Sequence, residues 1–202
     1  MNYIRKLYKQ DYRGFESLPH RRENVIEKYS VKSQRPLLKK YLVEDFGGMC
    51  IYCGWNCKRY DAASFHIEHI KSQIDNESLI DDYSNLALSC PICNTTKNKK
   101  ALPSDLDPLG EDYKNLFYRN NRGAIVTNND IEDRKKALSQ QYIKILGLSK
   151  ELYKLDYVQT SLNIIKRRLR QSDKINLELI NSITEILDFI DDNYTRQSNL
   201  TL

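Results

Sequence analysis

The sequence predicts an α+β fold that is mainly helical. Two observations predict it: two short apolar segments that suit β-strands lie between two C-x-x-C pairs, and apolar residues recur at helical spacing through the last third of the chain. We expect a basic N-terminal segment with one helix at residues 1–46, a small core of two strands and a helix at residues 47–103, and a helical C-terminal region at residues 104–202.

The composition fits a soluble globular protein, because 40% of the residues are hydrophobic and 29% are charged. No apolar run approaches the length of a membrane span, which argues against a membrane protein. The first six residues, Met1-Asn2-Tyr3-Ile4-Arg5-Lys6, lack the apolar stretch of a signal peptide. We therefore expect a cytoplasmic location.

The N-terminal segment carries the excess of positive charge behind the net charge of +5. Residues 1–49 hold 11 lysines and arginines against 6 acidic residues, and the rest of the chain is balanced. Such an arm suits contact with phosphate groups, although a solvated lysine-rich surface would have the same composition. The candidate contact residues are Arg5, Lys6, Arg21 and Arg22.

One helix is expected at the end of this segment. Pro36 suits the start of a helix, where its missing N–H is not needed. Apolar residues follow at helical spacing as far as Phe46, and Gly47-Gly48 then favours a stop.

The core is expected to contain two short strands and a helix. Residues 64–70 and 86–88 suit the strands, and the polar, acidic residues 71–84 suit a loop between them. Residues 91–100 are expected to turn into a helix that begins near Asn94.

The C-terminal region is expected to hold a small hairpin around residues 123–126 and helices from about residue 130. Gly147 suits a helix end, and Ser149 suits the cap of the next helix. Two apolar faces then follow, and they predict an antiparallel helical hairpin. The first face consists of Leu152, Leu155, Val158, Leu162, Ile165 and Leu169. The second consists of Ile175, Leu179, Ile183, Ile186 and Ile190, with Ile180 and Leu187 beside it.

Four of the five cysteines form two C-x-x-C pairs, Cys50 with Cys53 and Cys90 with Cys93, while Cys57 lies outside both. Two such turns can place four thiolates around one Zn²⁺, and in a chain without a secretion signal a metal site is favoured over disulfides or redox-active thiols. The pairs lie 36 residues apart, so they must enclose a folded insert. We expect the functional residues in that insert.

The insert concentrates residues that suit phosphodiester hydrolysis. His69 can act as a base near neutral pH, and Glu68 and Asn94 offer oxygen ligands for Mg²⁺ or Mn²⁺. Asn85 can orient the base. His66 lies two residues before Glu68 on the expected strand, so both side chains can share one face; it contacts metal or phosphate, or it is a hydrogen-bonded structural histidine.

These motifs resemble the zinc-knuckle version of the HNH endonuclease family. The likeness runs through Cys50-Ile51-Tyr52-Cys53-Gly54, His66-Ile67-Glu68-His69-Ile70, Tyr83-Ser84-Asn85-Leu86 and Cys90-Pro91-Ile92-Cys93-Asn94, with Lys97. It implies a ββα-metal fold with a structural zinc. It also implies that His69 is the general base, Glu68 and Asn94 bind the catalytic metal, and Asn85 steadies the base and its loop. The family has Asp where this chain has Glu68, so the added methylene shifts the expected metal position.

A closer likeness links the chain to the HNH subunit of Septu-type and retron-linked anti-phage defence systems. It rests on the first six residues, the sequence His66-Ile67-Glu68-His69 and the length of the chain. It implies an ABC-type ATPase as a partner protein, with the C-terminal helices as the docking surface. The same helices can equally be the core of this region. The positive run from Lys166 to Arg170 suits nucleic acid, an acidic partner or a solvated helix face.

Three functional hypotheses follow. The leading one is an endonuclease with one catalytic metal, acting on nucleic acid with DNA favoured, little sequence preference, and Lys97 among the backbone contacts. The second is a zinc-stabilised nucleic-acid binder without catalysis, which would need only the cysteines. The third is an assembly subunit that holds an ATPase, and it is compatible with the first.

Overall fold

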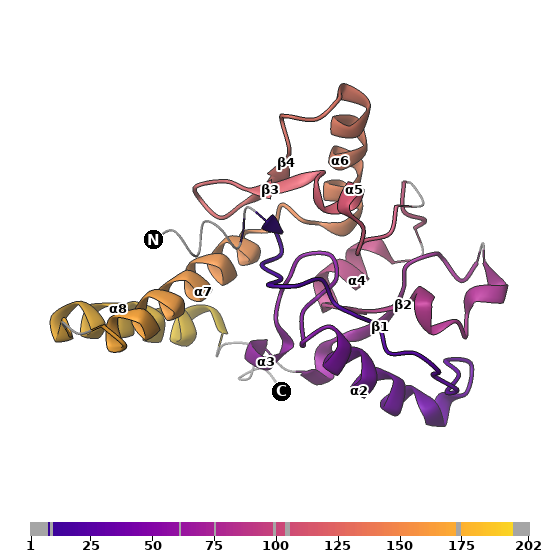
Figure 1. The fold of residues 1–202 in the computed structure, drawn as a ribbon, viewed down its shortest axis with the longest axis horizontal. Helices are drawn as coiled ribbons and strands as arrows, with labels where there is room; N and C mark the ends of the chain where they lie inside the picture. Colours follow the sequence, from indigo (N-terminus) through magenta and orange to yellow (C-terminus); the bar gives the residue numbers. More distant parts are fainter. Residues whose placement is uncertain are drawn as a thin grey trace.

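The computed structural model describes residues 8, 10–60, 62–74, 76–98, 100–103, 106–172 and 175–195. Figure 1 shows the two strands of the predicted core between helices α2 and α4, a second hairpin beside α6, and the long helices α7 and α8 extending away from the rest. The predicted mainly helical α+β class is confirmed. Among the described residues, no helix is both long enough and apolar enough to cross a membrane.

The helices longer than one turn are α2 (Arg35–Asp45), α4 (Pro91–Lys97), α6 (Asp133–Leu146), α7 (Glu151–Arg170) and α8 (Leu177–Ile190). The one-turn helices are α3 (Cys57–Tyr60) and α5 (Glu111–Lys114). The strands are β1 (His66–His69), β2 (Leu86–Ser89), β3 (Phe117–Arg119) and β4 (Ile125–Thr127).

Helix α2 forms where the sequence predicts it. A proline lies in its first turn, and Leu38 and Leu42 are fully buried on one face. The helix ends before Phe46, and Gly47 and Gly48 follow with positive φ angles that favour glycine. Its buried face packs against β1 and β2, so α2 supports the strand pair.

Strands β1 and β2 form an antiparallel pair in which Glu68 lies opposite Ala87 and His69 lies opposite Leu86. All four residues of β2 are buried, which explains its uniformly apolar sequence up to Ser89. The predicted loop between the strands contains two short 3₁₀ turns, Glu77–Leu79 and Tyr83–Asn85.

Helix α4 begins three residues earlier than we predicted. It starts at Pro91 rather than near Asn94, because proline suits the first turn and the Cys90 thiol caps it by accepting a hydrogen bond from the Cys93 N–H at 3.4 Å. Asn94 therefore lies within the helix, one turn after its start.

The predicted hairpin is confirmed as the antiparallel pair β3–β4, and Gly147 ends α6 in the left-handed conformation. Helix α8 packs against α7, as predicted for a helical hairpin. The buried face of α8 is shifted from the predicted one. Its buried residues are Ile180, Ile183, Leu187 and Ile190, whereas Leu179 and Ile186 are 43% and 48% exposed, because α7 covers only one side of a broad apolar face.

One hydrophobic core joins all three predicted segments. It contains Tyr12 from the N-terminal segment, both cysteine pairs, and Tyr153 from α7. Two arginines link the three segments through hydrogen bonds to main-chain carbonyls. The buried Arg13 pairs with Asp11 and donates to the carbonyls of Ile51 and Pro108, and Arg119 donates to the carbonyls of Tyr12, Cys53, Gly123 and Tyr153. The boundaries at residues 46/47 and 103/104 stay a prediction, but the packing across them is continuous.

Candidate active site

Four buried cysteines form a cluster that fits one structural zinc ion. The sulfur atoms of Cys50, Cys53, Cys90 and Cys93 all lie within 4.8 Å of one another, and those of Cys53 and Cys90 are 3.7 Å apart. A zinc–sulfur bond of about 2.3 Å in a tetrahedron requires a sulfur–sulfur separation of about 3.8 Å. The geometry and the soft thiolate donors therefore both fit Zn²⁺, as predicted.

The cluster joins the two ends of the insert. The first cysteine turn is held against β2 by a hydrogen bond from the Ile51 N–H to the Leu88 carbonyl at 2.9 Å. The second pair lies at the junction of β2 and α4. The metal site thus fixes the strand–helix junction on which the neighbouring pocket depends.

Helix α7 adds a contact that the sequence analysis missed. The Tyr153 hydroxyl lies 3.2 Å from the Cys93 sulfur and is buried beside the cluster. A hydroxyl is a suitable donor to a metal-bound thiolate. Nothing in the local sequence marks this tyrosine, because it follows Cys93 by 60 residues.

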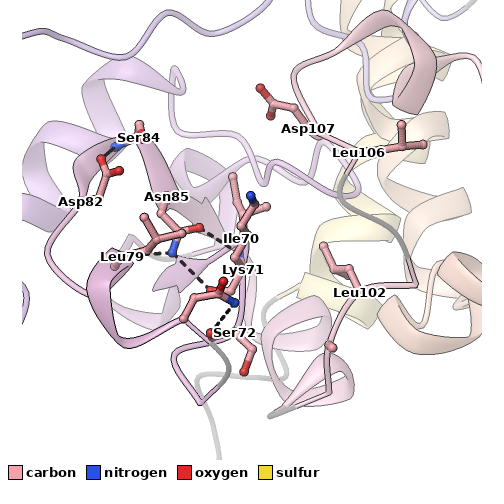
Figure 2. Close-up of a pocket in the computed structure, with 12 residues that line it drawn as sticks. Ile70, Lys71, Ser72, Leu79, Asp82, Ser84, Asn85, Leu102, Leu106 and Asp107 are labelled. Carbon is pink, nitrogen blue, oxygen red and sulfur yellow. Dashed lines mark hydrogen bonds between the residues drawn. The ribbon is translucent and has the colours of Figure 1, made fainter.

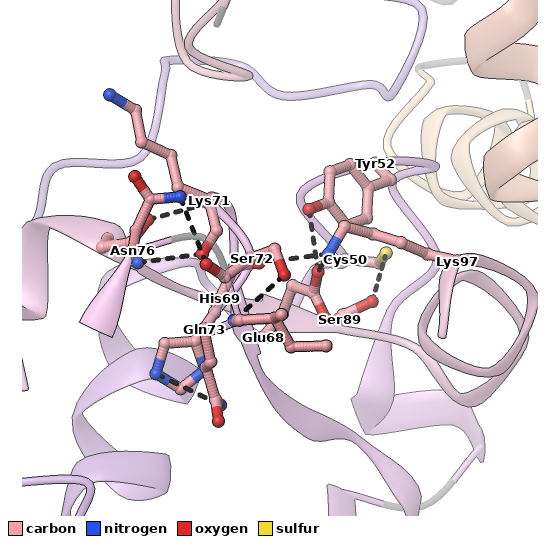
Figure 3. A network of polar contacts seen from close by, with 12 residues as sticks. Cys50, Tyr52, Glu68, His69, Lys71, Ser72, Gln73, Asn76, Ser89 and Lys97 are labelled. Carbon is pink, nitrogen blue, oxygen red and sulfur yellow. Dashed lines mark hydrogen bonds and ion pairs between the residues drawn. The ribbon is translucent and has the colours of Figure 1, made fainter. Parts of the chain in front are cut away.

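A pocket of about 330 Å³ lies between β1 and α4, and most of the predicted catalytic residues line it. His66, Glu68 and His69 line it from β1, and Asn94 and Lys97 line it from α4. The two elements converge because the cysteine cluster pins the end of β2 to the start of α4. Figure 3 shows the polar contacts around Glu68 and His69 at this pocket.

Glu68 is buried and is held by two donors. Lys97 Nζ lies 2.6 Å from its Oε1 atom, and the Tyr52 hydroxyl donates to the same oxygen at 3.1 Å (Figure 3). Burial raises the pKa of Glu68, and the Lys97 charge opposes this shift. With Oε1 engaged in this way, Oε2 is the oxygen that remains for a metal ligand.

His69 is oriented by the loop that follows β1. Its Nε2 atom lies 3.0 Å from the Ile80 carbonyl, and the Tyr29 ring packs edge-on against the imidazole at 4.5 Å between ring centres. A carbonyl only accepts hydrogen bonds, so Nε2 carries the proton and Nδ1 carries the lone pair of the neutral ring. Burial lowers the pKa of His69, which favours the neutral, basic form at neutral pH.

Asn85 lies outside this pocket and ties the loop together. Its Oδ1 accepts from the Lys71 N–H at 2.9 Å, and its Nδ2 donates to the Lys71 and Leu79 carbonyls, both at 3.2 Å (Figure 2). Asn85 lines a neighbouring cavity of about 620 Å³, whose lining residues are drawn in Figure 2. Because Leu79 precedes Ile80, Asn85 acts on the position of the His69 ring through the loop.

Lys97, which we predict to contact nucleic acid, has partners inside the fold. Its side chain is buried, with 3% of the residue exposed, and it pairs with Glu68 and donates to the His69 carbonyl at 3.2 Å. Both of these partners lie within the protein, and the contact of Lys97 with nucleic acid stays a prediction. His66, by contrast, is exposed in the same pocket, and partial burial together with the nearby Lys39 lowers its pKa.

The arginines predicted to contact nucleic acid have other partners. Arg22 binds Asp45 and Glu44 on α2. The Arg21 guanidinium lies against the Phe46 ring and donates to the Leu86 carbonyl, so it faces the fold. The contact of these two arginines with nucleic acid stays a prediction. Arg5 and Lys6 lie outside the described residues.

Three residues around His69 were missed by the sequence analysis: Tyr29, Gln73 and Tyr52, the last acting through Glu68. Gln73 lies four residues after His69, in a polar loop where no local pattern distinguishes it. Tyr29 and Tyr52 are two of 14 tyrosines, and only the tertiary structure brings them to the site.

Comparison with known families supports the interpretation of the insert. Residues 50–100 match the family model described as HNH endonuclease. No curated protein has a sequence that matches this chain. The matched region begins at the first cysteine, ends after α4 and contains the whole pocket except Tyr29. The match and the four-cysteine cluster together identify an HNH endonuclease domain at residues 50–100, and with it a phosphodiester hydrolase whose substrate is nucleic acid.

Proposed function

We propose that this domain cleaves DNA with one catalytic divalent metal ion, using His69 as the general base and Glu68 and Asn94 as metal ligands. The observation that carries the proposal is the single pocket in which a neutral imidazole, a carboxylate and an amide lie together. A carboxylate and an amide oxygen are hard ligands of the kind that Mg²⁺ and Mn²⁺ prefer. The metal, when bound, would stabilise negative charge on the phosphate and on the leaving oxygen.

The chain's own residues then account for the proton transfer. Nδ1 of His69 removes a proton from water as the water oxygen bonds to phosphorus and the bond from phosphorus to the 3′ oxygen breaks. The departing 3′ oxygen takes a proton from solvent to give a 3′-hydroxyl, the other strand end carries the 5′-phosphate, and His69 returns its proton to solvent. The Ile80 carbonyl stabilises the protonated ring through Nε2, and Asn85 keeps that carbonyl in place.

His66 is proposed to contact the phosphate or the metal. It lies on the same face of β1 as Glu68, is exposed and opens to the same pocket. Its exposure favours contact with a ligand over the alternative of a structural histidine. Lys39, whose charge acts on His66, adds positive potential beside the pocket.

The metal ligands can be tested without measuring catalysis. Mn²⁺ binding is measured by electron paramagnetic resonance for the wild type, Glu68→Gln and Asn94→Ala, with Asn163→Ala on α7 as a matched control remote from the pocket. We expect weaker Mn²⁺ binding in the first two variants only. Equal binding in all four proteins would contradict the proposed ligand set.

We further propose that the nuclease works in a bacterial anti-phage defence complex with an ABC-type ATPase. The likeness of the His66–His69 motif and of the chain's first residues supports this, and so does an apolar stripe on α8 formed by the exposed Leu179, Ile186 and Phe189. Co-expression with the ATPase of a Septu-type system tests it. Leu179→Ser/Ile186→Ser should abolish co-purification, because both side chains are exposed and neither supports the zinc domain. The proposed docking would be contradicted if the double variant co-purified with the ATPase as well as the wild type does. It would also be contradicted if the wild type did not co-purify with the ATPase at all.

The alternative is a zinc-stabilised nucleic-acid binder without catalysis. Such a protein needs the cysteine cluster but not His69 or its contacts with Ile80 and Tyr29. The family match and the oriented imidazole favour the nuclease. A His69→Ala variant that retains every measurable activity of the wild type would favour the binder.

A further inference from the structure

The Glu68 carboxylate is held by two donors through a single oxygen. Lys97 Nζ lies 2.6 Å from Oε1, and the Tyr52 hydroxyl donates to the same atom at 3.1 Å (Figure 3). Within the part of the chain that the structure describes, both polar partners of this carboxylate contact Oε1. A side chain held by buried donors keeps one orientation, so the direction of Oε2 is fixed as well.

Each of the two donors belongs to one of the two cysteine turns. Tyr52 lies between Cys50 and Cys53 and is fully buried. Lys97 follows Cys93 by four residues on α4, so their side chains share one face of that helix, and both residues are buried. Because the four-cysteine cluster joins these turns, the arrangement that fits a zinc ion also sets the separation of the two donors.

The turn that carries Tyr52 is itself anchored to the fold. The Ile51 N–H donates to the Leu88 carbonyl on β2 at 2.9 Å, and the Tyr52 carbonyl accepts a hydrogen bond from the Tyr12 hydroxyl. Strand β2 in turn pairs with β1, which carries Glu68. The hydroxyl and the carboxylate therefore belong to elements that are both bonded to β2, and this common support fixes their contact.

We propose that Tyr52 and Lys97 are positioning residues for the catalytic metal ion, which hold Oε1 of Glu68 from the two cysteine turns and leave Oε2 as the metal ligand. This inference rests on the proposed role of Glu68 as a metal ligand. A glutamate side chain loses rotamer freedom when it is ordered, and the two donors meet that cost before the metal binds. Loss of a hydrogen-bond partner of a metal-binding carboxylate typically costs about 10- to 100-fold in metal affinity.

Tyr52→Phe tests the proposal in the full, zinc-loaded chain, because it removes the hydroxyl and keeps the buried ring. Mn²⁺ binding is measured by electron paramagnetic resonance. The matched control is Tyr83→Phe, which removes another buried tyrosine hydroxyl that donates to a carboxylate, that of Asp45, at 2.8 Å. We expect the affinity for Mn²⁺ to fall about 10- to 100-fold in Tyr52→Phe and to stay at the wild-type level in Tyr83→Phe.

The affinity for zinc separates positioning of Glu68 from support of the cysteine cluster. Competition with a chromogenic zinc chelator measures it for the wild type and Tyr52→Phe. We expect equal values, because the Tyr52 hydroxyl donates to Glu68 rather than to a zinc-binding sulfur. A parallel fall in the affinities for zinc and Mn²⁺ would assign Tyr52 to the zinc site, and the proposal would be wrong.

Glu68→Gln, measured in the same Mn²⁺ titrations, separates failure of this inference from failure of the proposed ligand set. If binding falls in Glu68→Gln but not in Tyr52→Phe, Glu68 is a ligand that needs no positioning, and the inference is wrong. If neither variant differs from the wild type, or the wild type binds no Mn²⁺, the ligand set is wrong and the inference fails with it. An equal fall in Tyr52→Phe and Tyr83→Phe would also overturn the inference, because it would show a general loss of order.

Discussion

At the scale of single residues, the ion pair with Lys97 stabilises the charged form of the buried Glu68 carboxylate, which is the form that can bind a metal ion. Burial disfavours the charged form of Glu68, while Lys97 and Tyr52 stabilise it from within the fold. An ion pair of this kind is costly to break from one side, because the remaining charge keeps its desolvation penalty without compensation.

Lys97→Met should therefore lower the free energy of unfolding by about 3–5 kcal/mol. The reason is the uncompensated Glu68 carboxylate, since methionine fills a similar volume. Urea denaturation measures the change. The double variant Glu68→Gln/Lys97→Met should recover part of the loss, and a single-variant cost below about 1 kcal/mol would show that the pair behaves as a surface ion pair.

The pKa of His69 gives a pH prediction. Burial lowers this pKa from its usual value near 6.5, so the ring stays neutral, and able to act as a base, at pH values where an exposed histidine is already protonated. We expect the acidic limb of the kcat/KM profile to lie below pH 6.5. A limb above pH 6.5 would mean that the base is another group or that His69 is not buried in solution.

The candidate catalytic residues that share the pocket were predicted from the sequence, whereas the residues that contact them were not. His69, Glu68 and Asn94 stand in a recognisable order, because their spacing is fixed by one strand and one helix. Tyr29, Gln73 and Lys97 make contacts that have no local signal, because the burial and the tertiary partners of a residue do not show in its sequence neighbourhood.

At the scale of elements, α7 both extends away from the rest of the fold and contributes to the cysteine cluster. Its Tyr153 hydroxyl contacts the Cys93 sulfur, and its Tyr153 carbonyl accepts from Arg119. Contacts to the ligands of a metal typically tune its affinity, because they stabilise the charged ligand form. The start of α7 is thereby coupled to the nuclease domain.

Tyr153→Phe should lower the affinity for zinc by about 10- to 100-fold, because it removes the donor to the thiolate and keeps the ring. Competition with a chromogenic zinc chelator measures the change. Tyr157→Phe is the matched control on the same helix, since the Tyr157 ring contacts Tyr8 rather than the cysteines. Equal affinities in the two variants would show that Tyr153 only packs against the cluster.

The elements themselves were predicted well where a local signal exists. The stops at Gly47 and Gly147 and the strands at residues 66–69 and 86–89 follow from turn chemistry and apolar runs. The start of α4 was placed too late because the Cys90 thiol acts as a cap. The face of α8 was misplaced because a broad apolar face does not reveal which side its neighbour covers.

At the scale of the whole molecule, a single core runs from Tyr12 through the cysteine cluster to Tyr153. The zinc site lies where the three predicted segments meet, and Arg13 and Arg119 bridge them by hydrogen bonds to main-chain carbonyls. Loss of the metal should therefore destabilise this whole core.

Removal of zinc should lower the midpoint of thermal unfolding by about 10 °C or more, because a structural metal contributes directly to folding free energy. Calorimetry should show one cooperative transition for the zinc-loaded protein. Two separate transitions, with only one sensitive to zinc, would show that the C-terminal region folds independently of the cysteine cluster.

The most direct test of the central claim is cleavage of supercoiled plasmid DNA with Mg²⁺ or Mn²⁺ by the wild type, His69→Ala and His20→Ala, the last as a histidine outside the pocket. The account predicts that the wild type and His20→Ala nick or linearise the plasmid and that His69→Ala does not. Equal cleavage by all three proteins would contradict the assignment of His69 as the general base.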